Sequence, residues 1–91
     1  MYLLITYDIS SDKRRNKIDK LLSSYGHRVN YSVFELEVKS HIHNEIKTKL
    51  TVLIGKYDSI RIYRLDKTAL ERAVELGENR QDPFEMESSY V

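Results

Sequence analysis

One aspartate near the amino terminus has the residue type and position for chemistry on a phosphodiester. Asp8 follows the apolar run Tyr2–Tyr7, so we expect it at the carboxyl end of a buried strand, a favoured place for sites in α/β proteins. Alternation along the run puts Asp8 on the face opposite Leu3 and Ile5. The alternative is an aspartate that caps the following turn through backbone N–H groups. Position alone leaves both interpretations open.

A basic segment follows this aspartate. Its members are Lys13, Arg14, Arg15, Lys17 and Lys20. Arg14 and Arg15 lie one turn before Ile18, so they extend the inward stripe of a helix, while the lysines form a separate outward line. Cations in the first turn of a helix oppose its dipole, so helix stability does not explain Arg14 and Arg15. Phosphate binding does explain them, because guanidinium groups beside the free N–H groups of a helix start suit an anion. The alternative is a solvated face with local pairs, such as Asp12 with Arg15.

Further along, Arg28 shares one side of a predicted strand with Asn30 and Ser32, and this side is a candidate extension of the phosphate-binding surface. An ordinary polar strand face is the alternative for Asn30 and Ser32.

His41 and His43 have no carboxylate or cysteine nearby at metal-ligand spacing, so no zinc site is predicted. Tyr7 is predicted to be a core or interface residue.

The elements that position these residues alternate between strand and helix. The sequence predicts strands at Tyr2–Tyr7, Arg28–Val38 and Ser59–Leu65, and helices from about Asp12 to Gly26 and over Asn44–Ile54. We expect an α+β fold, a ferredoxin-like βαββαβ sandwich with two helices on one face of an antiparallel sheet. Residues 1–78 would form this domain, and the acidic residues 79–91 would form a tail or a C-terminal edge strand.

Composition narrows the class of protein. The chain has 91 residues, 41% hydrophobic and 32% charged, which is typical of a single globular domain. It has no apolar run of membrane-spanning length and no signal-peptide pattern, so we expect no membrane association and a cytoplasmic location. It has no cysteine, which excludes disulfides and a cysteine nucleophile. Because two helices cover one sheet face while the strands carry apolar residues on both, we expect a homodimer across the uncovered face.

Three segments, in order along the chain, carry a family resemblance. They are Tyr7-Asp8-Ile9 with Asp12-Lys13-Arg14-Arg15-Asn16-Lys17, then Arg28-Val29-Asn30-Tyr31-Ser32-Val33-Phe34-Glu35, then Asp58-Ser59-Ile60-Arg61-Ile62-Tyr63-Arg64-Leu65. Together, from Tyr2 to about Leu76, they resemble the small CRISPR-associated endonuclease family, the second of the two core proteins of spacer acquisition.

The resemblance implies roles for individual residues. It implies a homodimer with facing sheets, in which the two Asp8 carboxylates share one Mg²⁺ near the twofold axis. Arg15 and Arg28 match the family's catalytic arginines, and Ser32 and Phe34 match its other site positions. With Arg14 and Lys17, these basic residues and Ser32 would bind nucleic acid. Lys17 stands where some members have arginine, so it keeps the charge without the bidentate geometry.

Three functions remain open at this point. The first is a magnesium-dependent endonuclease of CRISPR adaptation that acts on RNA or DNA. The second is a non-catalytic DNA-binding adaptor at the centre of the integrase complex, and the third is a ribonuclease related to the virulence-associated toxins. The integrase subunit is the expected protein partner. The acidic segment Glu78–Val91 would either dock this partner or complete the sheet of the dimer itself.

Overall fold

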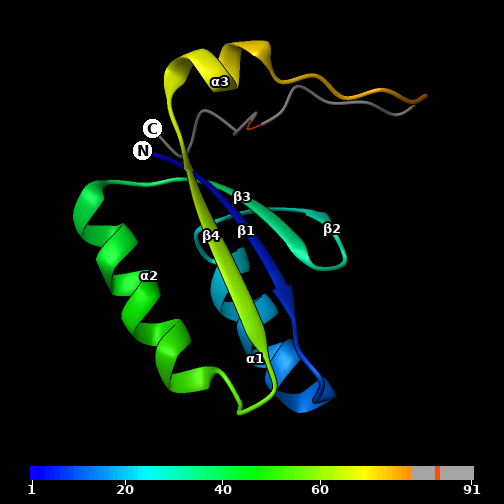
Figure 1. Cartoon of the computed structure of the whole chain (residues 1–91), viewed down its shortest axis with the longest axis vertical. Coiled ribbons are helices and arrows are strands. Elements are labelled where there is room, and N and C mark those ends of the chain that lie inside the picture. Colours follow the sequence, from blue (N-terminus) through cyan, green and yellow to red (C-terminus); the bar gives the residue numbers. More distant parts are fainter. Residues whose placement is uncertain (79–83, 85–91) are drawn as a thin grey trace.

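The computed structural model of the protein describes residues 1–78 and residue 84. Along the chain, the elements are β1 (Tyr2–Asp8), α1 (Asp12–Ser23), β2 (Gly26–Asn30), β3 (Val33–Glu37), α2 (Ser40–Leu53), β4 (Ser59–Leu65) and α3 (Lys67–Arg72) (Figure 1). The predicted tail or edge strand over 79–91 lies outside the described residues, apart from Phe84.

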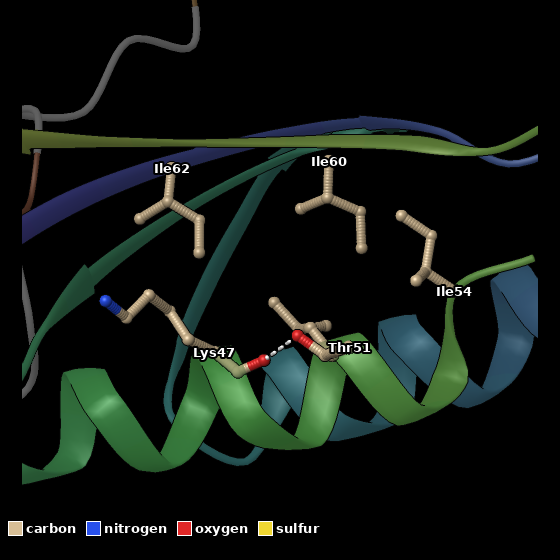
Figure 2. A pocket seen from close by; sticks show the side chains of 6 residues that line it. Lys47, Thr51, Ile54, Ile60 and Ile62 are labelled. Carbon is tan, nitrogen blue, oxygen red and sulfur yellow. Dashed lines mark hydrogen bonds between the residues drawn. The ribbon is translucent and has the colours of Figure 1, made fainter.

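The four strands form one antiparallel sheet in the order β2-β3-β1-β4 (Figure 1). Both long helices, α1 and α2, lie on the same side of it (Figure 2). This is the ferredoxin-like α+β arrangement, so the predicted fold class is confirmed. Within the described part of the chain, no helix is long and apolar enough to cross a membrane.

The core lies between the sheet and these two helices. Its fully buried members are Leu3 and Ile5 of β1, Ile18 and Leu22 of α1, Phe34 and Leu36 of β3, and Ile46 of α2. Burying a side chain of this size contributes about 1.5–3 kcal/mol. The core residues of β1 alternate with Leu4, Thr6 and Asp8, which therefore lie on the face without helices, here called the open face.

The predicted single strand over Arg28–Val38 is wrong, because the segment is a hairpin. β2 and β3 pair with each other across a turn at Tyr31 and Ser32, with a register shift between Arg28 and Asn30. The Asn30 side chain accepts a hydrogen bond from the Tyr31 backbone N–H at 2.8 Å, a local contact typical of turns. Strand-favouring residues on both sides of this turn conceal it in the sequence.

The second helix begins at Ser40, earlier than the predicted Asn44. Its first turn is formed by the N–H groups of Ile42 and His43, which donate to the Lys39 carbonyl at 3.0 and 3.1 Å. Lys39 makes no side-chain cap, so the usual sequence signal for a helix start is missing. The start of this helix is therefore hard to place from the sequence.

The open face combines apolar and charged side chains. The strand register places Arg61 and Tyr63 of β4 beside Thr6 and Leu4 on this face. At its other end, Phe84 packs edge-on against the ring of Tyr2, and its N–H donates to the Glu35 carboxylate at 2.9 Å. Phe84 therefore covers one end of the open face and leaves the end near Asp8 uncovered by described residues.

Candidate active site at the carboxyl end of β1

Three structural elements meet where β1 ends. On one side lies the β2–β3 turn, because the Tyr7 N–H donates to the Ser32 carbonyl at 3.1 Å. On the other side lies the start of β4, since Asp8 is opposite Ser59 in the β1–β4 ladder. The chain then enters α1 (Figure 1). The first turn of this helix carries Arg14 and Arg15. The candidate residues are thus gathered at one end of the sheet.

Asp8 is exposed on the open face, as the alternation predicts. The capping alternative fails, because other side chains serve the turn. Ser11 caps α1 by accepting from the Arg14 N–H at 3.3 Å, and Asp58 accepts from the Ser10 N–H at 3.0 Å. Among the described residues, the Asp8 carboxylate has no hydrogen bond or ion pair, so it is free for a ligand.

Arg14 and Asp58 tie the loop after β1 to the loop before β4. Arg14 Nε donates to Asp58 Oδ2 at 2.8 Å, and the same oxygen accepts from the Gly55 N–H at 2.8 Å. The Asp58 side chain is fully buried, and the pKa of its carboxyl is held well below the usual range, chiefly by the Arg14 hydrogen bond and then by the Ser10 N–H. Arg14 therefore supports the loop that carries Asp8.

Arg15 makes the local pair that was the alternative to phosphate binding. Its Nη1 donates to the Ile9 carbonyl at 3.2 Å, and its Nη2 forms an ion pair with the exposed carboxylate of Asp12. Lys17 lies exposed on the outward side of α1. The side chain of Arg15 is about a third exposed, so part of it faces solvent near the end of β1.

Arg28 belongs to a second cluster, on the helix side of the sheet. Its Nη2 donates to the Asp19 carboxylate and to the Tyr31 carbonyl, both at 2.8 Å. The Tyr7 hydroxyl also donates to Asp19, and burial followed by this contact raises the pKa of Tyr7 to about 12. Because the Phe34 ring centroid lies 6.0 Å from the guanidinium carbon, Arg28 is held against the core side of β3.

The sequence-predicted residues therefore separate into two groups. Tyr7, Phe34 and Arg28 lie together on the helix side, and Ser32 contributes its backbone at the turn. Asp8 is adjacent to Tyr7 in the chain but points to the open face. A phosphate held at Asp8 is on the other side of the sheet from Arg28 of the same chain.

Sequence reasoning missed Asp19 and Asp58 as organisers of this region. Asp19 is the one acidic residue among the basic residues of positions 13–20, and this isolation was the available signal. Asp58 follows Gly55 in the connection before β4, where an aspartate commonly binds nearby backbone N–H groups. Both carboxylates fix arginines that the sequence assigned to nucleic acid.

The carboxylate of Asp8 fits Mg²⁺ in ligand type, because this ion uses oxygen ligands and often only one or two carboxylates beside water and phosphate. No group of three or more histidine, aspartate or glutamate side chains within the described residues could hold a metal ion. The proposal of a metal site in this part of the chain therefore starts from the single exposed carboxylate of Asp8.

An apolar groove runs between α2 and β4 on the helix side of the sheet. Its volume is about 240 Å³, and its lining is Lys47, Leu50, Thr51, Ile54, Ile60 and Ile62 (Figure 2). The Thr51 hydroxyl donates to the Lys47 carbonyl at 2.7 Å, so it is not directed at a ligand. Since β4 is the last strand of the sheet formed by the described residues, the groove lies along an edge to which a further strand can add.

The fold and the end of β1 define a class: a ferredoxin-like α+β protein with a free aspartate at the end of its first strand and an arginine-bearing helix next to it. The family described as CRISPR associated protein Cas2 matches residues 1–73. The chain belongs to this family.

Similar proteins agree with this membership. A protein of Chloroflexus aurantiacus named CRISPR-associated endoribonuclease Cas2 3 is 42% identical over 78 residues, which cover 85% of this chain and 84% of that protein. One of Methanospirillum hungatei named CRISPR-associated endoribonuclease Cas2 2 is 42% identical over 84 residues, covering 92% and 94%.

Solved structures give the same picture. The crystal structure of Streptococcus pyogenes Cas2 at pH 6.5 is similar with a TM-score of 0.75 and 41% identity, covering 85% of this chain and all of that one. A chain of a partial Cas6-RT-Cas1--Cas2 complex is similar with a TM-score of 0.72 and 30% identity, covering 82% and 89%.

Proposed function

We propose that this protein is a magnesium-dependent endonuclease of CRISPR spacer acquisition, which acts on RNA or DNA phosphodiesters. The observation that carries the proposal is the free Asp8 carboxylate, exposed at the end of β1 while Ser11 and Asp58 satisfy the turn behind it. Relatives over most of the chain bear the name CRISPR-associated endoribonuclease, which supports the same activity.

Asp8 would hold the Mg²⁺ ion. When bound, the ion would lower the pKa of a coordinated water and offset charge on the phosphodiester. Arg15, about a third exposed near the end of β1, would bind a phosphate of the nucleic-acid backbone, with Lys17 adding charge from the outward side of α1. Arg14 would contribute mainly by fixing the loop through Asp58.

Arg28 and Ser32 would contact the nucleic acid at the β2–β3 turn. Arg28 lines a hollow of about 260 Å³ with Val29, Asn30 and Tyr31, and 43% of its side chain is exposed. Asp19 and the Tyr31 carbonyl fix the guanidinium in place, so binding costs little side-chain entropy. This contact is to a backbone segment beyond the one held at Asp8, because the two side chains lie on opposite sides of the sheet.

A homodimer across the open face would complete the metal site. Leu4 and Tyr63 lie in the middle of this face and Val33 lies closer to Asp8. All three are only partly covered by described residues, and Tyr63 is 44% exposed. A second copy related by a twofold axis would bury this surface and bring the two Asp8 carboxylates to one shared ion.

The integrase subunit is the proposed protein partner, and the similarity to a chain of a Cas6-RT-Cas1--Cas2 complex supports an assembly of this kind. The edge of β4, which no described strand pairs, and the apolar groove beside it suit the addition of a strand. We propose that residues 79–91 dock the integrase, and completion of the dimer's own sheet is the alternative.

We also propose a cytoplasmic location, which fits a protein that acts on nucleic acid.

A non-catalytic adaptor is the second candidate function, and one observation favours it. Arg14, Arg15 and Arg28 are each ion-paired with a carboxylate of the same chain, which reduces their positive potential at a scissile phosphate. Such a protein would bind the DNA backbone for the integrase without cutting it. The toxin alternative gains no support, since the named relatives carry CRISPR names.

Cleavage assays separate the two candidates. RNA and duplex DNA are incubated with the wild type, Asp8→Asn and the exposed control Glu71→Gln, each with Mg²⁺ and with EDTA. The endonuclease proposal predicts magnesium-dependent cleavage by the wild type and the control, and loss of cleavage in Asp8→Asn. Equal residual cleavage by all three proteins, with nucleic-acid binding intact, would establish the adaptor.

A further inference from the structure

Arg61 lies on the open face beside Asp8. In the β1–β4 ladder Asp8 is opposite Ser59 and Thr6 is opposite Arg61. Residues opposite each other point to the same face, so Arg61 is the diagonal neighbour of Asp8. Diagonal pairs in an antiparallel sheet are about 7–8 Å apart, within reach of a long side chain.

Arg61 differs from the other arginines near this end of the sheet in its partners. Arg14, Arg15 and Arg28 are each bound to an aspartate, whereas Arg61 has no ion pair to any carboxylate of residues 1–78 and 84. Within the same residues, its hydrogen bond runs from Nη1 to the Tyr63 hydroxyl at 3.1 Å. A guanidinium has five N–H donors, so most of them remain free on the exposed side chain.

We propose that Arg61 binds the phosphate that lies at Asp8. A phosphodiester is repelled by the exposed aspartate, and a guanidinium on the same face offsets this repulsion and donates from its fork to two phosphate oxygens. The contact with Tyr63 holds the side chain along β4 before the phosphate arrives. This inference rests on the proposed function in placing nucleic acid at Asp8, and it adds the positive group that Arg28, on the other side of the sheet, cannot supply there.

Arg64 provides a matched control. It lies three residues later on the same strand, is also exposed, and also lacks a carboxylate partner within the described residues. It is opposite Leu3 in the ladder, so it points to the helix side. Arg61→Gln and Arg64→Gln remove the same charge from the same strand, on opposite faces.

The test measures the affinity of the full-length protein for a labelled duplex DNA of unrelated sequence over a series of KCl concentrations. We expect Arg61→Gln to flatten the plot of log K against log[KCl] by about 0.9 for each Arg61 that contacts a phosphate. Arg64→Gln should keep the wild-type slope. Arg61→Lys should keep the slope too, because it keeps the charge, but lower any magnesium-dependent cleavage, since lysine lacks the fork.

A wild-type slope in Arg61→Gln would overturn the inference. So would loss of self-association in Arg61→Gln by sedimentation, because the side chain would then hold the two copies together instead of binding phosphate. Absence of cleavage by the wild type would refute the proposed nuclease activity alone, while the salt slope would still decide whether Arg61 binds phosphate.

Discussion

At the scale of single residues, Asp8 owes its free carboxylate to its neighbours. Ser11 caps α1, and Asp58 accepts the Ser10 N–H, so nothing in the described turn draws on Asp8. Asp58 in turn accepts a hydrogen bond from Arg14. A Cβ at Gly55 would lie 2.6 Å from the guanidinium carbon of Arg14, so any side chain there would displace the arginine. These contacts connect the loops on both sides of the candidate site.

Asp58→Asn is expected to destabilise the protein in a pH-dependent manner. The pKa of Asp58 in the folded protein is below its ordinary value of about 3.9, so ionised Asp58 contributes stability above that value. This contribution is lost as the pH falls toward the folded pKa. Urea unfolding at a series of pH values should show the largest difference from the wild type at neutral pH and a shrinking difference below about pH 4.

Glu45→Gln is the control for this experiment, because Glu45 also has a lowered pKa but forms an exposed pair with Lys49. Exposed pairs of this kind contribute little, so its effect should be small at every pH. If the stability difference between Asp58→Asn and the wild type is constant from neutral to acid pH, the charge of Asp58 has no part in joining the loops after β1 and before β4.

At the scale of elements, the hydrophobic pattern predicted the helices and strands that have a regular apolar period. The first strand and the strand Ser59–Leu65 agree with the structure, because each has a regular apolar period. The first helix begins at Asp12 as predicted but ends at Ser23, and Gly26, the expected stop, is the first residue of β2. The β2–β3 turn was not predictable in this way, since Tyr7 and Arg28 hold it by contacts to the Tyr31 carbonyl that depend on the folded sheet. The ion pairs of Arg14 and Arg28 escaped prediction for the same reason, as their partners are set by tertiary packing.

Gly26→Ala is expected to weaken the pairing of β2 with β3. A Cβ at Gly26 would lie 2.4 Å from the Glu35 backbone oxygen and 2.8 Å from Leu36 Cγ, so the two strands would have to move apart. Overpacking of this kind typically costs about 1–3 kcal/mol. Thermal or urea unfolding measures the loss, with the exposed helical substitution Ser23→Ala as a control. A stability equal to that of the control would contradict the close approach of the strands.

At the scale of the whole molecule, the sheet has helices on one face and a partly apolar face opposite them. Apolar residues on both faces of the strands predicted a second copy on the open face, and in the proposed dimer the two Asp8 carboxylates on that face would form the shared site. The sequence could not show which of its basic residues lie on the helix side of the sheet and which lie on the open face. Strand register alone places Arg28 on one side and Arg61 on the other.

Tyr63→Lys is expected to weaken the dimer. It would place an ammonium group within the proposed interface, where burial of an unpaired charge is unfavourable, and an effect of about 1.4 kcal/mol raises the dissociation constant tenfold. Tyr57→Lys is the matched control, since Tyr57 is 84% exposed in the connection before β4. Sedimentation at several concentrations measures both. Equal dissociation constants for the two variants would place the interface elsewhere.

Mixed dimers show whether two Asp8 carboxylates form one site, as proposed. Wild type and Asp8→Asn are unfolded together in varying proportions, refolded, and assayed for magnesium-dependent cleavage at constant total protein. If both carboxylates are required, the rate falls as the square of the wild-type fraction, because random assembly leaves only dimers with two wild-type chains active. A rate that falls linearly with this fraction would show that each Asp8 works alone and would contradict the shared site.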